Sequence, residues 1–227
     1  MYMIKAVLID IDNTLLDFCK SANKTIKMLF DKKELTCTDE VFSVFHEIND
    51  GLWQRIERKE LTKPEMYKLR WKLVLEALHI DYDSDLMEQE FRSTLSGVAE
   101  PVDNAYEMLE YLSRKYKLYA ASNSSYEHQI KRLTSSDMLK YFEEIFVSEK
   151  VGALKPAKEF FDVCFSEIGD VNVDEVVMIG DSLTADILGG NEYGIKTIWF
   201  NPNYLEIPEQ PKPDFTINSL LEVKNIL

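Results

Sequence analysis

The chain has 227 residues, of which 45% are hydrophobic and 29% are charged, and it is long enough to bury a substantial core. Its formal net charge of −14 argues against a nucleic-acid polymer as partner, because phosphate backbones bind to basic surfaces. The apolar runs are too short to span a membrane, residues 1–9 lack the cleavage site of a signal peptide, and three dispersed cysteines favour a reducing cytoplasm without disulfides.

The first predicted element is a buried strand over residues 4–9, an apolar run that ends abruptly at Asp10. Apolar residues on both faces are typical of a strand inside a parallel sheet. Residues 21–95 then carry helical patterns with little strand signal. Within them, residues 62–65 (TKPE) have the pattern of a capping box with proline in the first turn, which predicts a helix from there to about Leu78.

From residue 102 onward, strand-like and helix-like segments alternate. Strands are predicted over residues 116–121, 145–148, 175–179 and 196–200, with a last short strand near Phe215. Helices are predicted over residues 103–114, 125–133, 157–168 and 183–193. Alternation of this kind is typical of a parallel sheet with helices on its faces. The sequence therefore predicts an α/β, Rossmann-like core, with the all-helical stretch inserted after the first strand.

Polar residues follow each of the first four predicted strands of this core. In chain order these segments are residues 10–14 (DIDNT), Ser122 with Asn123, Lys155 with Pro156, and residues 180–186 (GDSLTAD). Ligands of open parallel sheets bind at the carboxyl ends of the strands, so these segments are expected to converge. Carboxylates packed together repel one another, and a divalent cation removes that repulsion. Oxygen ligands without His or Cys point to Mg²⁺ rather than Zn²⁺, and the whole set fits phosphoryl transfer.

The same four segments resemble the sequence motifs of the haloacid dehalogenase-like hydrolase superfamily, in their usual order. The first is Asp10-x-Asp12-x-Thr14, and the fourth is Gly180-Asp181 followed by Asp186. The helical insert resembles the small helical caps of some members, which implies a discontinuous core at residues 1–16 and 97–227 and a cap at residues 17–96. Residues 49–53 (NDGLW) and 180–202 resemble the pyrimidine 5′-nucleotidase branch of the superfamily.

The resemblance implies a role for each motif residue. Asp10 is the expected nucleophile, which forms an aspartyl-phosphate, and Asp12 is the expected general acid and base. A protonated leaving group needs such an acid and a departing halide does not, so Asp12 argues against dehalogenase chemistry. Lys155 is expected to neutralise the charge that develops. The phosphoryl oxygens are expected to contact Ser122, Asn123, Lys155 and the backbone N–H of Asn13.

The metal site implied by the resemblance consists of three groups. They are a carboxylate oxygen of Asp10, the backbone carbonyl of Asp12 and the side chain of Asp181, and they would hold Mg²⁺. Asp186 is expected to act behind these ligands, by orienting a metal-bound water or Lys155. In the cap, Asn49 and Trp53 are the residues proposed to contact the leaving group.

The resulting hypothesis is a Mg²⁺-dependent phosphomonoester hydrolase whose substrate is a small phosphorylated metabolite, a nucleoside monophosphate. One alternative keeps the chemistry and changes the substrate to a sugar phosphate or phosphoglycolate, or makes the enzyme a mutase. Another alternative is an inactive regulatory or partner-binding module on the same fold. No membrane or nucleic-acid partner is expected, and the sequence leaves the oligomeric state undetermined.

Overall fold

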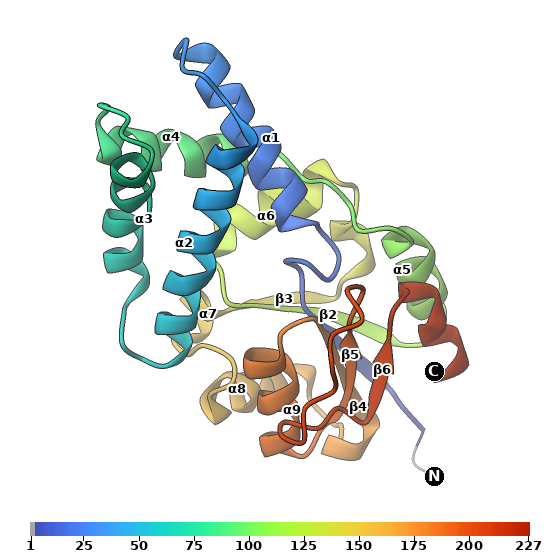
Figure 1. The fold of residues 1–227 in the computed structure, drawn as a ribbon. Helices are drawn as coiled ribbons and strands as arrows, with labels where there is room; N and C mark the ends of the chain where they lie inside the picture. Colours follow the sequence, from blue (N-terminus) through green and yellow to red (C-terminus); the bar gives the residue numbers. More distant parts are fainter. Residues whose placement is uncertain (1–2) are drawn as a thin grey trace. The chain divides into compact units, whose positions relative to one another are not determined.

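The structure is a computed structural model that describes residues 3–227 (Figure 1). The described chain divides into two compact units. The larger unit contains the residues up to Asp17 together with Glu100–Leu227, and the smaller unit is Phe18–Ala99. The smaller unit is therefore inserted into the larger one in the sequence, and the two are described separately below.

The larger unit is built on a six-stranded parallel sheet with the strand order β3-β2-β1-β4-β5-β6. The strands are β1 (Ala6–Ile9), β2 (Lys117–Ser122), β3 (Glu144–Val147), β4 (Val176–Gly180), β5 (Lys196–Phe200) and β6 (Phe215–Ile217). All four residues of β1 are buried, as expected for a strand with apolar neighbours on both faces. This arrangement confirms the predicted α/β, Rossmann-like fold.

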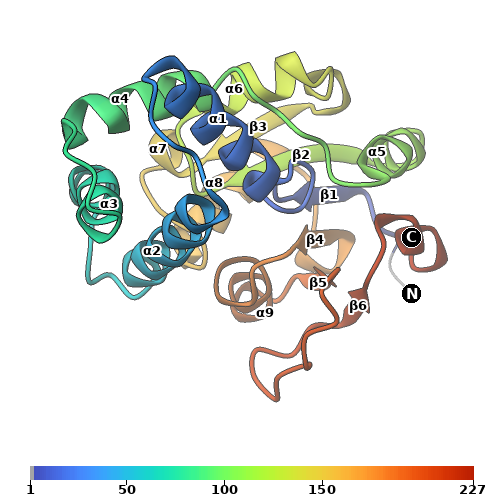
Figure 2. The same cartoon turned by 45° about the horizontal axis from the view of Figure 1, so that its top comes forward.

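Helices precede or follow most strands of this sheet, whereas residues 201–214, which join β5 to β6, form a loop without a helix (Figures 1 and 2). The helices are α5 (Ala105–Ser113), α6 (Tyr126–Ser135), α7 (Ser148–Val151), α8 (Lys158–Ile168) and α9 (Leu188–Tyr193), with short turns η1 (Leu139–Tyr141), η2 (Val173–Glu175), η3 (Leu183–Ile187) and η4 (Leu220–Asn225). Phe160, Phe161 and Cys164 of α8 pack with Leu8 and Met178 of the sheet in one buried cluster.

The segment over residues 183–193, predicted as one regular helix, has a different first turn in the structure. Residues Leu183–Ile187 form a wider π-type turn, and the regular helix begins only at Leu188. The hydroxyl of Ser182 accepts a hydrogen bond from the N–H of Ala185 and so caps this turn. Turns of this type occur often at functional sites, and here the turn carries Asp186.

The smaller unit contains four helices: α1 (Phe18–Lys32), α2 (Asp39–Glu57), α3 (Lys63–Ala77) and α4 (Ser84–Leu95). The predicted capping box at the start of α3 is present, because Thr62 and Glu65 each accept a hydrogen bond from the other's backbone N–H. The buried ring of Trp71 lies 5.4 Å from that of Phe45 and 5.5 Å from that of Phe91, between centroids. These contacts give the unit a hydrophobic core of its own.

A buried ion pair joins three helices of the smaller unit. Arg70 of α3 donates to Glu88 of α4 over 2.6 and 3.1 Å, and to the side-chain oxygen of Asn49 of α2 over 3.0 Å. All three side chains are buried. Burial raises the pKa of Glu88, while the charge of Arg70 opposes this effect. The network therefore fixes α2, α3 and α4 by polar contacts in addition to their apolar core.

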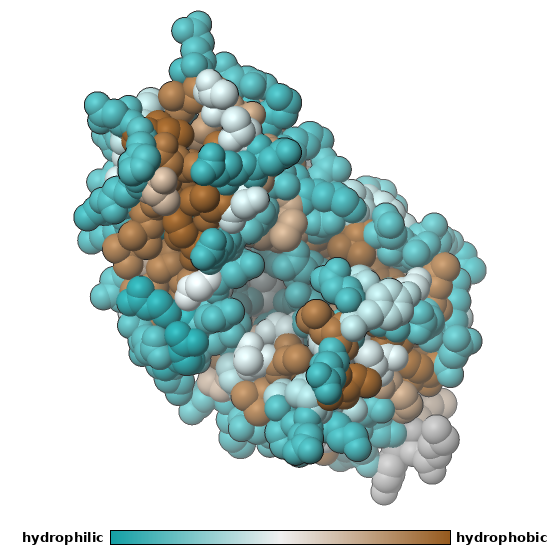
Figure 3. All heavy atoms as spheres, viewed as in Figure 1, coloured by the Kyte–Doolittle hydropathy of each residue, from teal (hydrophilic) through white to brown (hydrophobic). Residues whose placement is uncertain are grey.

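Hydrophilic residues cover most of the face seen in Figure 3, and hydrophobic residues gather over α2 and α3. Among residues 3–227, no helix combines the length and the apolar character needed to cross a bilayer.

Candidate active site

The loop after β1 places the first group of candidate residues. The N–H groups of Leu15 and Leu16 both donate to the carbonyl of Ile11, so the chain turns back immediately after the strand. Thr14, which is buried, comes to lie with its hydroxyl 3.2 Å from Oδ2 of Asp10 and 3.3 Å from Oδ1 of Asp181. One hydroxyl thus bridges the ends of β1 and β4, two strands that are neighbours in the sheet.

Asn13 lies in the turn that follows β1. Its backbone N–H, which the resemblance assigns to a phosphoryl oxygen, donates to the carbonyl of Leu16 over 2.8 Å. The reason is the turn itself, in which Asn13 adopts a φ of 61°. Asn tolerates this left-handed conformation better than most residues, so it suits this position of the turn.

Lys155 lies at the centre of the carboxylates, and only 2% of it is exposed. Its Nζ lies 2.8 Å from Oδ1 of Asp10 and 2.7 Å from Oδ1 of Asp186. Burial alone would lower the pKa of Lys155, but the charges of these two carboxylates raise it, so the side chain stays charged. The side chain of Asn123 accepts from the backbone N–H of Lys155 and donates to its carbonyl, over 2.8 and 2.9 Å. Asn123 therefore fixes the segment that presents the lysine.

Asp10, Asp181 and Asp186 form an acidic cluster, in which one carboxylate oxygen from each lies within 4.8 Å of the others. Burial raises the pKa of Asp10 to about 7, although Lys155 opposes this shift. Burial, together with the charges of Asp10 and Asp186, also raises the pKa of Asp181 well above its ordinary value. One lysine does not balance three carboxylates, so the cluster has the excess negative charge and the oxygen donors that suit a divalent cation.

Asp186 is held in place from two sides. Its Oδ1 contacts Lys155, and its Oδ2 accepts from the backbone N–H of Ser182 over 3.1 Å. Gly180 makes this close approach possible, because a Cβ there would lie 2.1 Å from Oδ2 of Asp186. This arrangement is compatible with the predicted supporting role of Asp186, although its carboxylate also belongs to the acidic cluster.

Asp12 has a different environment from Asp10. Its Oδ1 pairs with the guanidinium of Arg132, and its Oδ2 accepts from Nε2 of Gln129 over 2.6 Å. Burial works to raise the pKa of Asp12, but the charge of Arg132 and the hydrogen bonds from both residues lower it. The same Nε2 of Gln129 donates to the buried hydroxyl of Ser122 over 2.9 Å.

The roles of Gln129 and Arg132 are absent from the sequence-based prediction. Both lie on the buried face of α6, together with Leu133. A Gln and an Arg three residues apart on the inner face of an amphipathic helix indicate that polar partners lie nearby in the fold, because buried polar side chains need partners. Their partner Asp12 is more than 100 positions away, so the sequence alone does not identify it.

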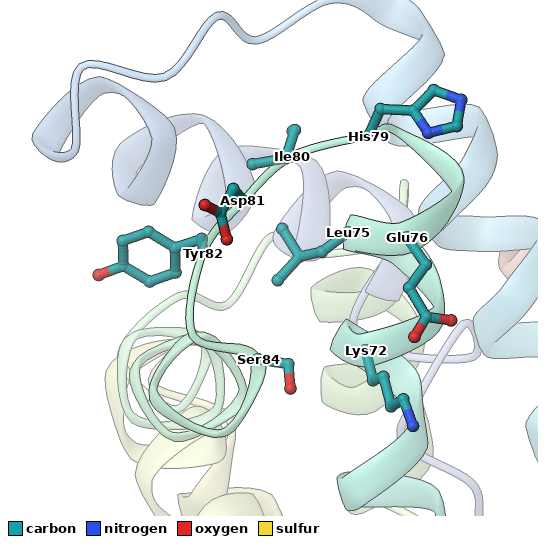
Figure 4. Close-up of a pocket in the computed structure, with 8 residues that line it drawn as sticks. All are labelled: Lys72, Leu75, Glu76, His79, Ile80, Asp81, Tyr82 and Ser84. Carbon is teal, nitrogen blue, oxygen red and sulfur yellow. The ribbon is translucent and has the colours of Figure 1, made fainter.

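The two candidate residues of the smaller unit lie on α2. The side chain of Asn49 is buried, accepts from Arg70 and donates to Asp50 over 3.3 Å. Trp53 is half-buried. A cavity of about 510 Å³ in the same unit is lined by residues of α3 and the segment after it (Figure 4). Asn49 and Trp53 do not line it.

The parallel sheet, with carboxylates and a buried lysine beyond the carboxyl ends of its strands, defines a Rossmann-like α/β protein with an acidic site at the edge of its sheet. The model of the haloacid dehalogenase-like hydrolase family matches residues 4–194, and the chain belongs to this family. This finding confirms the resemblance seen in the sequence motifs.

Several relatives align along at least 97% of the chain. HAD-hydrolase YfnB of Bacillus subtilis is 33% identical over 227 residues, which cover 100% of this chain and 97% of YfnB. Pyrimidine 5′-nucleotidase PynA of Streptococcus pneumoniae is 32% identical, with 98% and 97% of the two chains covered. Pyrimidine 5′-nucleotidase YjjG of Escherichia coli is 27% identical, with 97% and 96% covered.

A crystal structure of YfnB bound to magnesium superimposes on this chain with a TM-score of 0.94 at 32% identity. The superposition covers 100% of this chain and 99% of YfnB.

Proposed function

We propose that the chain is a Mg²⁺-dependent phosphomonoester hydrolase that acts through an aspartyl-phosphate on Asp10. The observation that carries this proposal is the contact of Asp10 with Lys155 inside a cluster of three carboxylates. A buried carboxylate beside a fixed cation is suited to attack an anionic phosphoryl group, because the cation offsets the repulsion between the two.

The proposed reaction uses two aspartates in sequence. A carboxylate oxygen of Asp10 attacks phosphorus as the bond from phosphorus to the leaving oxygen breaks. In its protonated form Asp12 donates a proton to that oxygen; as the carboxylate that the charge of Arg132 favours, it then accepts a proton from the water that attacks phosphorus and releases phosphate and free Asp10. Lys155 supplies positive charge to Asp10 and the phosphoryl oxygens throughout, while Ser122 and the backbone N–H of Asn123 donate to those oxygens.

Mg²⁺ is the metal that the donor set fits, because the cluster offers oxygen ligands only. The proposed ligands are the side chains of Asp10 and Asp181 and the backbone carbonyl of Asp12, with Asp186 behind them. When bound, the ion neutralises negative charge at the site of phosphoryl transfer. The magnesium in the YfnB structure supports this assignment.

The proposed substrates are nucleoside monophosphates, and pyrimidine ones in particular. The names of PynA and YjjG support this choice, since both relatives align along at least 97% of the chain. The smaller unit is proposed to act as the cap that contacts the leaving group, through Asn49 and Trp53. For Asn49 this contact requires a group other than its side-chain oxygen, which Arg70 occupies. The three free cysteines support a cytoplasmic location.

Phosphate release from a panel of phosphomonoesters tests the proposal. The panel contains pyrimidine and purine monophosphates, hexose phosphates and phosphoglycolate, each with Mg²⁺ and with chelator, for the wild type and Asp10→Asn. We expect Mg²⁺-dependent turnover that is fastest with pyrimidine nucleotides and is lost in Asp10→Asn. A hexose phosphate or phosphoglycolate as the best substrate would contradict the nucleotide assignment alone. No turnover of any compound would favour the inactive regulatory module.

A further inference from the structure

Helix α6 holds the carboxylate of Asp12 through two side chains, Gln129 and Arg132, which lie one turn apart. Arg132 pairs with Oδ1 and Gln129 donates to Oδ2, so both oxygens of the carboxylate are held. The two side chains also approach each other, with Nη1 of Arg132 lying 3.4 Å from Oε1 of Gln129. The three side chains thus form a closed network of hydrogen bonds around the Asp12 carboxylate.

Arg132 is buried although two of its nitrogens lack hydrogen-bond partners in the described part of the chain. The side chain has 0% exposure, and its Nε and Nη2 have no hydrogen-bond partner among residues 3–227. Buried donors without partners cost free energy, and a buried guanidinium costs more than a neutral group. A leucine or methionine would fill the same interior position without that cost. Among residues 3–227, the one nitrogen of the guanidinium that has a charged partner is Nη1, which contacts Asp12.

Gln129 connects Asp12 to a second part of the site. Its Nε2 donates to Asp12 over 2.6 Å and to the hydroxyl of Ser122 over 2.9 Å. Because Ser122 accepts this bond, its own proton is available to donate to another oxygen. One amide therefore sets the positions of the proton donor and of the hydroxyl that is proposed to bind a phosphoryl oxygen.

We propose that Gln129 and Arg132 are positioning residues for the general acid and base: they hold the Asp12 carboxylate in the orientation from which it transfers protons. The inference rests on the proposed function and deepens it. Neither residue is assigned a contact with substrate. Displacement of a catalytic group by about 1 Å can cost about 10²-fold in rate, so loss of either contact is expected to reduce proton transfer strongly.

The dependence of rate on the leaving group tests this role. An alkoxide leaving group needs the proton from Asp12, whereas 4-nitrophenolate leaves readily without one. The value of kcat/KM reports the steps up to formation of the aspartyl-phosphate, and so isolates the acid role. It is measured for alkyl, phenyl and 4-nitrophenyl phosphates with wild type, Arg132→Met, Arg132→Lys, Gln129→Ala and Lys131→Met. Lys131 is the exposed neighbour of Arg132 and serves as the matched control.

We expect Arg132→Met to lower kcat/KM about 10²-fold for the alkyl phosphate and less than about tenfold for 4-nitrophenyl phosphate. Gln129→Ala is expected to show the same trend more weakly, Arg132→Lys to recover part of the loss, and Lys131→Met to match the wild type. In an Asp12→Asn background, Arg132→Met is expected to add little further loss with 4-nitrophenyl phosphate, because it acts through Asp12.

Equal losses for all leaving groups, or a full additional loss in the Asp12→Asn background, would show that Arg132 supports the fold and not the proton transfer. Thermal unfolding of each variant identifies misfolding, and Arg132→Lys keeps the test usable if Arg132→Met does not fold. An inactive wild type on every phosphate would overturn the proposed function instead. An active wild type with unaffected variants would overturn only the positioning role.

Discussion

The ammonium of Lys155 lies 2.8 Å from Oδ1 of Asp10, although the two residues are 145 positions apart in the chain. The contact forms because Asp10 directly follows β1, while Asn123, which directly follows the neighbouring strand β2, bonds to both the backbone N–H and the carbonyl of Lys155. The fold thus brings a cation to a buried carboxylate.

Replacement of this cation is the first prediction. Lys155→Met is expected to lower kcat/KM about 10²- to 10³-fold, because the phosphoryl group then approaches uncompensated carboxylates. Steady-state phosphate release measures the change. Lys158→Met is the matched control, since Lys158 is an exposed lysine that pairs with Asp162 at the surface. A loss of less than tenfold for Lys155→Met would contradict the role assigned to the lysine.

The raised pKa of Asp181 predicts how stability depends on pH without metal. A carboxyl whose native pKa is raised keeps its proton in the folded state where the unfolded chain has lost it. The free energy of unfolding therefore decreases as pH rises above about 4, the ordinary carboxyl pKa. Asp10, whose pKa is raised to about 7, contributes to the same decrease up to about that pH. Asp181→Asn is expected to stabilise the metal-free protein by about 1–2 kcal/mol near pH 8 and to have little effect near pH 4.

Urea unfolding in the presence of chelator measures this difference. Asp170→Asn, which changes an exposed carboxylate of the same unit, serves as control and is expected to be neutral at both pH values. Destabilisation by Asp181→Asn near pH 8 would show that the cluster does not carry the excess charge described above.

Metal binding is expected to reduce the repulsion between the carboxylates of Asp10, Asp181 and Asp186. Mg²⁺ should raise the thermal unfolding midpoint of the wild type, and more strongly near pH 8 than near pH 5, because protons compete with the ion for carboxylates. Thermal scans with Mg²⁺ and with chelator measure the shift. Asp181→Asn should lose most of it and Asp170→Asn should keep it. An equal shift in all three proteins would place the bound ion elsewhere.

Replacing either of two glycines by alanine is expected to change the free energy of unfolding, in opposite directions for the two positions. Gly180→Ala places a Cβ 2.1 Å from Oδ2 of Asp186, so Asp186 and its partner Lys155 must move. We expect a loss of about 1–3 kcal/mol in stability together with a marked loss of activity. Gly51 lies within α2 with no atom within 4 Å of the added Cβ, and Gly51→Ala should stabilise by about 0.5–1 kcal/mol. Chemical denaturation of both variants distinguishes the two outcomes.

The buried pair of Arg70 and Glu88 predicts the stability of the smaller unit. Arg70→Met leaves the Glu88 carboxylate buried without its cation, at an expected cost of about 3–5 kcal/mol. Hydrogen exchange of peptides from α2, α3 and α4 measures the local effect. The double variant Arg70→Met with Glu88→Met should recover much of the loss. If the single and double variants are equally stable, the pair contributes little.

The order of strands and helices in the larger unit followed from periodicity in the sequence. Residues 4–9 predicted β1, and the observed strand is Ala6–Ile9, because an apolar run on both faces is typical of a parallel strand. The proximity of Asp10, Lys155 and Asp181 followed in turn, since the carboxyl ends of parallel strands meet at one edge. This part of the site depends on topology, which the hydrophobic pattern determines.

Other features depended on backbone and side-chain conformations that no pattern specifies. The N–H of Asn13 is used by a tight turn, and the π-type turn at Leu183–Ile187 replaces a regular helical start. The partners of Arg132 are decided by how α6 packs beside the loop after β1. A charged residue on a helix is usually solvent-exposed, so the buried position of Arg132 became evident only in three dimensions.

Trapping of the aspartyl-phosphate tests the central claim most directly. Borohydride reduces an acyl phosphate to the alcohol, so wild-type protein quenched during turnover with Mg²⁺ and a phosphomonoester should contain homoserine at position 10 in peptide mass spectra. Asp10→Asn treated in the same way should contain none. Sustained turnover by the wild type with no modification at position 10 would contradict the account, because phosphate would then be released without a covalent bond to Asp10.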